Sequence, residues 1–192
     1  DLLTAKKLIP TKFKVMVKVE KPSAMKEIES ITENSDGIMV ARGDLGVETN
    51  PEDVPIHQRT MVAACRKYGK PCIVATQMLE SMIDSPTPTR AEASDVATAV
   101  FQGVDAVMLS AESAAGNYPK ESVEMMNKII KRVESDPKYL ANIQNYNLNM
   151  VKTSTEAIAT AALEVATIAE CSCIATFSQS GRSVLRVARM RP

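Results

Sequence analysis

The chain of 192 residues carries 23 basic and 23 acidic side chains, and 45% of its residues are hydrophobic. This balanced charge lacks the basic excess of a nucleic-acid-binding domain, no apolar run approaches the roughly 18 residues that span a membrane, and we expect no signal peptide. None of the four cysteines forms a Cys-x-x-Cys motif, which favours a reduced, cytoplasmic protein.

The chain opens with a helical stretch over residues 1–9, which Pro10 ends, and the apolar and β-branched residues of segment 14–20 then predict a strand. Lys18 and Glu20 stand two positions apart near the end of this strand, so they project from the same face. Two interpretations remain open. The pair belongs to a site for an anionic, metal-bound ligand, or it is a surface ion pair that stabilises little.

Three further apolar runs, each followed by a helix, indicate buried parallel strands. The strands are predicted over residues 38–41, 72–76 and 105–109, and the helices over residues 55–68 and 89–103 and from Pro119 onward, after a first short helix that Ser23 caps. Thr89 and Glu92 form a capping box. Polar residues follow the carboxyl end of every strand, where α/β sheets and (β/α)8 barrels place their sites. The four units form either an open sheet or half of a barrel.

The remaining residues predict the beginning of a second unit. Residues 134–153 are rich in Asn, Gln, Tyr and Lys and indicate a polar connector. A second capping box at residues 153–156 precedes a helix, a strand is predicted over residues 173–177, and a last helix follows the serine-rich turn 178–183. We expect these apolar side chains to face inward: Val123, Met126, Ile130 and Val133 on the helix after Pro119, and Ile158, Ala162, Val165 and Ile168 on the helix after the connector. We therefore expect two domains, residues 1–135 and residues 136–192.

The ends of the first two strands supply candidate chemistry. Glu20 and Asp44 follow neighbouring strands, which lie about 4.8 Å apart, so they can share one Mg²⁺. Lys18 can stabilise negative charge that develops on a substrate, and Gly43 lets backbone amides approach an anion closely. Thr76 adds a hydroxyl at the next strand end. The alternatives are a tight turn with a helix cap around Asp44 and a strand-favouring role for Thr76.

The turn at residues 178–183 leads into a helix and carries three serines, a glycine and an arginine. Hydroxyls and backbone amides at a helix N-terminus form a phosphate site, although ordinary capping with a surface arginine explains the same residues. Other charges next to strand ends can simply order loops by ion pairing: Arg42, Glu80, Arg90 and Glu112.

Five segments closely resemble pyruvate kinase, in that family's order and at its spacing. They are Lys18-Val19-Glu20 and residues 36–46, 75–82, 88–92 and 108–112. The resemblance covers essentially the whole chain and is weakest in the polar connector. It implies an α/β fold in which residues 1–135 form the second half of a (β/α)8 TIM barrel, made of four β/α units. Residues 136–192 then begin the family's C-terminal α/β domain.

The same resemblance implies a function: transfer of the phosphoryl group of phosphoenolpyruvate to ADP, which gives pyruvate and ATP. It also implies Mg²⁺, for which Mn²⁺ can substitute, and K⁺, whose ligands lie outside this chain. The family is usually homotetrameric. Because the lid domain and the nucleotide-contacting arginines also lie outside these residues, we expect a fragment that is inactive alone.

Individual residues match the family's site. Lys18 matches the lysine that stabilises the transferring phosphoryl group and the enolate, and Glu20 and Asp44 match the Mg²⁺ ligands. The amides of Gly43 and Asp44 match those that hold the substrate carboxylate, and Thr76 matches the hydroxyl near the protonated face of the enolate. Two further sets are implied: Ser110 and Glu112 as polar residues lining the site, and Ser178, Ser180, Gly181, Arg182 and Ser183 as an effector-phosphate loop.

Ala111 and Ser113 depart from the Gly and Thr that are more familiar in the family after the serine at position 110. Two alternatives to phosphoryl transfer stay open. One is a Mg²⁺-dependent pyruvate or oxaloacetate lyase on a related barrel, against which the long Thr-Gln-Met-Leu-Glu-Ser-Met match speaks. The other is a non-catalytic half-barrel whose open sheet edges bind a partner.

Overall fold

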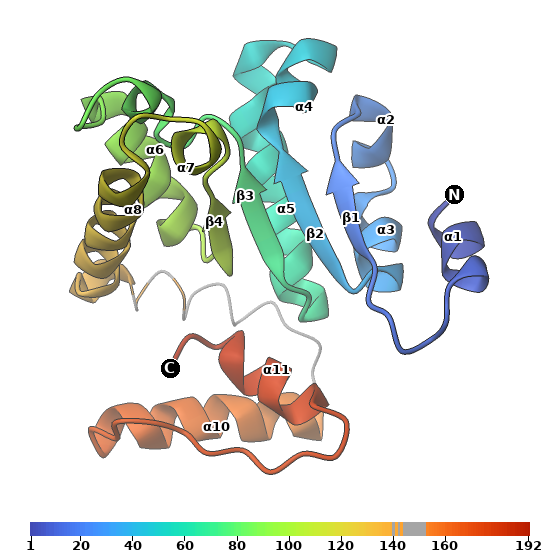
Figure 1. Cartoon of the computed structure of the whole chain (residues 1–192). Coiled ribbons are helices and arrows are strands. Elements are labelled where there is room, and N and C mark those ends of the chain that lie inside the picture. Colours follow the sequence, from blue (N-terminus) through green and yellow to red (C-terminus); the bar gives the residue numbers. More distant parts are fainter. Residues whose placement is uncertain (140, 142, 144–152) are drawn as a thin grey trace.

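A four-stranded parallel sheet with strand order β1-β2-β3-β4 forms the centre of the computed structural model, which describes residues 1–139, 141, 143 and 153–192 (Figure 1). The strands are β1 (Met16–Val19), β2 (Gly37–Ala41), β3 (Cys72–Ala75) and β4 (Ala106–Met108). All four predicted strands of the first unit are therefore present. Their register places Val19 opposite Val40 and Ala41 opposite Ala75, so the carboxyl ends of the first three strands lie side by side.

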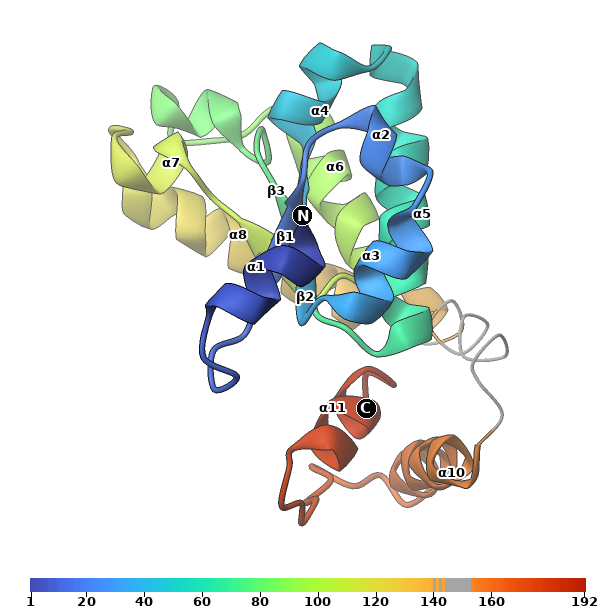
Figure 2. The ribbon, with the colours of Figure 1, turned by 90° about the vertical axis from the view of Figure 1, so that its right-hand side faces the viewer.

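Helices follow each strand and cover the sheet (Figures 1 and 2). The helices of the described residues are α1 (Leu2–Leu8), which precedes β1, then α2 (Pro22–Met25), α3 (Ile28–Asn34), α4 (Arg42–Glu48), α5 (Val54–Tyr68), α6 (Arg90–Phe101), α7 (Ala111–Ala114) and α8 (Pro119–Glu134), and, beyond the ends at which the strands begin, α10 (Ser154–Ile168) and α11 (Arg182–Ala188). Short 3-10 turns lie at Pro51–Asp53 and Glu80–Ile83. No helix in the described part of the chain is long and apolar enough to cross a membrane.

Local sequence explains where several helices begin and end. Gly69 ends α5 with a positive φ of 64°, a conformation that costs glycine little, and its amide bonds back into the last turn. The predicted capping box at Thr89 and Glu92 is confirmed, because each side chain accepts from the other's backbone amide. Ser23, however, lies inside α2 and does not cap it. Lys21 stands at the cap position, because Pro22 occupies the first turn.

The main core lies between the sheet and its helices. Ile38, Val40 and Val74 of the central strands are completely buried, and Met61 of α5 and Val96 of α6 pack against them. Cys65 and Cys72 are also buried here, as small hydrophobic residues. Their contact, together with burial, raises the pKa of the Cys72 thiol. On α8 the predicted stripe is confirmed for Met126 and Val133, but Val123 is 54% exposed.

The second unit differs more from the prediction. Ile158, Val165 and Ile168 of α10 are 69%, 63% and 84% exposed, and Ala159 and Leu163 are buried against Met190 instead. The helix therefore buries a different face from the predicted one, because α11 packs against the side of α10 that carries Ala159. The second predicted capping box is half present. Thr153 accepts from the Glu156 amide, but the Glu156 carboxylate pairs with Arg186 and Arg189.

The strand predicted over residues 173–177 is absent. This segment forms no ladder with any described strand, and Phe177 is 98% exposed. An extended segment becomes a strand only when a neighbour accepts its backbone hydrogen bonds. Most of the predicted polar connector, residues 140, 142 and 144–152, lies outside the described residues. The domain division at residue 135 stays a prediction.

Candidate active site at the carboxyl ends of the strands

One ammonium group joins the two candidate carboxylates. Lys18 Nζ lies 2.9 Å from Glu20 Oε2 and 2.8 Å from Asp44 Oδ2. Lys18 stands in β1, and Glu20 is the first residue after that strand. Asp44 lies in the first turn of α4, which begins where β2 ends. The period of two along β1 and the parallel pairing with β2 thus bring these side chains together at one edge of the sheet. All three side chains are about half exposed.

The contacts within this cluster stabilise the charged forms of Lys18 and Asp44. The hydrogen bond from Lys18 to Asp44, followed by the one to Glu20, raises the pKa of the Lys18 ammonium well above its usual value. The same contact lowers the pKa of the Asp44 carboxyl. Because an ammonium with a raised pKa stays protonated throughout the neutral range, Lys18 offers a fixed positive charge and is unsuited to donating a proton near pH 7.

The donor set suits a hard divalent cation. Both carboxylates already place an oxygen within 3 Å of one cationic atom, Lys18 Nζ, so their oxygens converge on a common point. Mg²⁺ is characteristically bound by one or two carboxylates, with substrate oxygens and water completing its octahedron. No group of three or more His, Cys, Asp or Glu residues gathers within the described ranges, so a cation between Glu20 and Asp44 would take its remaining ligands from substrate or water.

Thr76 lies beside Gly43 in a strained turn. Its hydroxyl accepts from the Gly43 amide at 2.7 Å and donates to the Ala75 carbonyl. Thr76 and Gln77 have φ values of 71° and 53°, which are unusual for residues with a Cβ and costly for a β-branched one. Such strain persists only where neighbouring contacts enforce it. The bond to the Gly43 amide places the Thr76 hydroxyl beside the first turn of α4, the helix that also carries Asp44.

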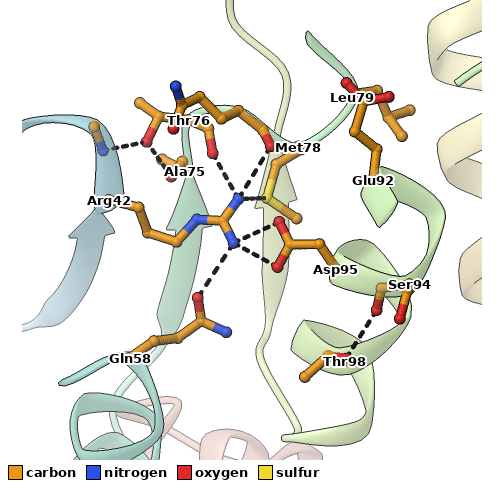
Figure 3. A network of polar contacts seen from close by, with 12 residues as sticks. Arg42, Gln58, Ala75, Thr76, Met78, Leu79, Glu92, Ser94, Asp95 and Thr98 are labelled. Atoms are coloured by element: carbon orange, nitrogen blue, oxygen red, sulfur yellow. Dashed lines mark hydrogen bonds and ion pairs between the residues drawn. The ribbon is translucent and has the colours of Figure 1, made fainter. Parts of the chain in front are cut away.

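Arg42 supplies those contacts (Figure 3). Its guanidinium donates to the Thr76 carbonyl at 2.6 Å and to Asp95 of α6 at 2.6–2.7 Å, with Gln58 of α5 at 3.5 Å. The Arg42 side chain is only 10% exposed. Ion pairing of Arg42 was predicted, but its partners were not. Asp95 and Gln58 stand in helical segments 53 and 16 residues along the chain, and nothing in their local pattern distinguishes them from solvated helix residues.

The other predicted site residues, Ser110, Glu112 and the turn 178–183, do not join the cluster around Lys18. Glu112, in the short helix α7 that follows β4, is buried, and its carboxylate accepts from the amides of Leu79 and Ser110. It therefore orders two loops at this edge of the sheet, and lining of the substrate site by Ser110 and Glu112 stays a prediction. The turn 178–183 lies elsewhere, beyond the opposite ends of the strands (Figure 1). There Arg182 Nε donates to the Ser180 hydroxyl, and Gly181 has a φ of 74°.

A parallel β/α sheet with charged side chains gathered at the carboxyl ends of its strands is typical of α/β proteins, open-sheet or barrel, whose sites lie at that edge. Comparison with known proteins narrows this class. A family model described as the pyruvate kinase barrel domain matches residues 2–123. The chain therefore belongs to the pyruvate kinase family.

Individual relatives agree. Two bacterial proteins named pyruvate kinase, from Agrobacterium vitis and Methylorubrum extorquens, are each 50% identical to this chain over all 192 residues, which is 40% of their length. A crystal structure of a pyruvate kinase from Cryptosporidium parvum aligns with a TM-score of 0.93 and 37% identity, covering the whole of this chain and 41% of that one. The chain thus spans about 40% of the length of its curated relatives, and its sheet corresponds to part of a barrel.

Proposed function

We propose that this chain supplies the lysine and metal-ligand half of a pyruvate kinase site, in which phosphoenolpyruvate donates its phosphoryl group to ADP. The convergence of Lys18, Glu20 and Asp44 on one point carries the proposal. Phosphoryl transfer depends mainly on positioning and on neutralising charge, and a fixed ammonium beside two metal-ligating carboxylates provides both. The family match favours this reaction over the lyase alternative.

Each residue has a proposed role. Glu20 and Asp44 hold Mg²⁺, or Mn²⁺ in its place, and a divalent ion there would neutralise oxygens of the phosphoryl group. Lys18, released from the carboxylates that it now contacts, stabilises negative charge on the transferring group and on the enolate. The Thr76 hydroxyl faces the side of the enolate that receives a proton. The amides of Gly43 and Asp44 hold the substrate carboxylate, which requires the Thr76 hydroxyl to share or release the Gly43 amide.

The wider context is proposed from the family alone: K⁺ bound by residues outside this chain, a homotetramer, and a cytoplasmic location. Ser110 and Glu112 are proposed to shape the substrate side of the site. Ser178, Ser180, Gly181, Arg182 and Ser183 are proposed to bind the phosphate of an effector. The exposed turn around Gly181 supports that role, because its backbone and hydroxyls remain accessible.

The 192 residues alone should not convert phosphoenolpyruvate and ADP to pyruvate and ATP, because they span only 40% of the length of the Agrobacterium vitis relative and form a sheet of four strands. A coupled assay of pyruvate formation on the purified chain checks this. Activity should appear when the chain replaces the matching segment of the Agrobacterium vitis pyruvate kinase, to which it is 50% identical. A normal turnover number for the isolated chain would contradict the proposal, and so would an inactive but folded chimera.

Metal binding can be measured without turnover. Mn²⁺ titrated into the isolated chain and followed by electron paramagnetic resonance should bind, and Glu20→Gln or Asp44→Asn should each weaken binding at least about tenfold, the loss expected when one contact to a charged oxygen is removed. Glu52→Gln is the matched control, since Glu52 is an exposed carboxylate outside the cluster. Equal affinity in all three variants would exclude this metal site.

A further inference from the structure

Two of the four cysteines lie outside the core and close together in the sequence. Cys171 and Cys173 are both exposed and free, and only Ser172 separates them. They follow α10 directly, on the segment that leads to α11 (Figure 1). Because both are exposed, neither fills the core, and neither belongs to the candidate active site. The reactivity of such thiols, more than their packing, decides what they can do.

The spacing of the pair allows the two sulfur atoms to bond with each other. Covalent geometry holds the Cα atoms of residues i and i+2 within about 7 Å, and disulfides join Cα atoms about 4.4–6.8 Å apart. The chain bends at Ser172, which shortens the separation below that of an extended chain. The two cysteines therefore reach disulfide geometry by a local adjustment, without movement of a helix.

The backbone around the pair is held on one side only. The Cys171 amide donates to the Ala166 carbonyl at 2.9 Å, which fixes the first cysteine against the last turn of α10. Within the described ranges, no backbone hydrogen bond holds Ser172 or Cys173, and their segment forms no ladder with a strand. A segment with few backbone hydrogen bonds rearranges at low cost, so Cys173 can move toward the anchored Cys171.

The other two cysteines differ in every one of these respects. Cys65 and Cys72 are each 1% exposed, in the core between α5 and β3. The hydrogen bond with Cys65, followed by burial, raises the pKa of the Cys72 thiol. Because the thiolate is the reactive form, a raised pKa and the lack of access both make this pair inert. The chain thus carries a buried thiol pair and an accessible one.

We propose that Cys171 and Cys173 form a reversible dithiol–disulfide site whose co-substrate is a small disulfide, such as glutathione disulfide. One cysteine thiolate attacks a sulfur of the small disulfide, forms a mixed disulfide and releases one small thiol. The other cysteine thiolate then attacks the protein sulfur of that mixed disulfide, forms the Cys171–Cys173 bond and releases the second small thiol. In total the two cysteines lose two electrons and two protons, and the small disulfide is reduced to two thiols.

The resulting disulfide should be easily reduced. A ring closed over a single intervening residue is strained, and strained or exposed disulfides have more oxidising potentials than structural ones. Closing so short a loop also removes little entropy from the unfolded chain, so the bond adds little stability. The site therefore stays reduced where thiols are in excess and closes when small disulfides accumulate, which is the behaviour of a redox sensor.

Glutathione disulfide added to the full chain at neutral pH, followed by intact-mass and peptide mass spectrometry, tests the site. The unchanged chain should lose the mass of two hydrogen atoms, with Cys171 and Cys173 linked in one peptide, and dithiothreitol should restore both thiols. Cys171→Ser and Cys173→Ser should each keep one glutathione instead, because no second thiol resolves the mixed disulfide. Both positions are exposed, so circular dichroism should be unchanged. Cys65 and Cys72 should stay unmodified until guanidinium unfolds the chain.

Four results would overturn the proposal. They are an unchanged mass, two glutathione molecules on the unchanged chain, disulfide-linked dimers in place of the internal bond, and modification of the buried thiol pair in the folded chain ahead of the accessible one. The experiment needs neither phosphoenolpyruvate nor ADP, so it does not rest on pyruvate kinase activity. Its failure would leave the proposed reaction intact, and an inactive chimera would leave this site intact.

Discussion

Lys18→Met in the Agrobacterium vitis chimera should lower kcat for pyruvate formation about 1,000-fold, the upper range for removing one preorganised donor from a charged transition state. The ammonium is positioned by two short contacts, to Glu20 and Asp44, and its raised pKa keeps it charged at every pH near neutrality. Methionine has a similar length without the charge, so the loss reports electrostatic stabilisation more than packing.

A second readout separates a catalytic role from a structural one. Lys18 occupies the point on which both carboxylates converge, so it competes with a metal for their oxygens. In the isolated chain, Lys18→Met should therefore bind Mn²⁺ as tightly as the unchanged protein or more tightly, although the chimera has lost turnover. Lys120→Met is the control, because Lys120 also pairs with a carboxylate, Glu124, but on the distant helix α8. A weakened Mn²⁺ affinity in Lys18→Met, or unchanged kcat, would contradict the proposed role.

Much of this site could be predicted from the sequence because its determinants are local. The period of two along a strand places Lys18 and Glu20 together, and parallel pairing of consecutive strands brings Asp44 beside them. Gly69 and the Thr89–Glu92 box are likewise short-range signals whose conformational reasons hold in any fold. The predicted four-strand unit was right for this reason.

The predictions that failed concern features that depend on residues far away in the sequence. A helix with apolar residues all round, such as α10, offers several possible inward faces, and the packing of α11 selects the Ala159 side over Ile158 and Val165. The expected strand at residues 173–177 needs a neighbour that the described residues do not supply. The partners of Arg42, on α5 and α6, could not be found from periodicity because they meet only after the sheet forms.

Arg42→Met should lower the free energy of unfolding by about 2–4 kcal/mol, between the values typical of exposed and of fully buried ion pairs. The Arg42 side chain is 10% exposed, whereas that of Asp95 is 35% exposed, so water can partly solvate the Asp95 carboxylate once the guanidinium is removed. Urea denaturation of the isolated chain measures the change. Arg59→Met, on the exposed side of α5, is the matched control and should change stability by less than about 0.5 kcal/mol. Equal shifts for the two variants would show that the network contributes nothing specific.

The same substitution should also disturb the proposed active site through the turn at Thr76. Arg42 holds the Thr76 carbonyl at 2.6 Å, and the strained φ of 71° keeps the threonine hydroxyl on the Gly43 amide. Without the guanidinium the turn can relax, so exchange of the Gly43 amide hydrogen should accelerate in Arg42→Met more than global destabilisation explains. Asp95→Asn removes the ion pair and keeps the carbonyl contact; it should reproduce part of the stability loss but leave Gly43 protected. If both variants accelerate Gly43 exchange equally, the ion pair and not the carbonyl contact positions Thr76.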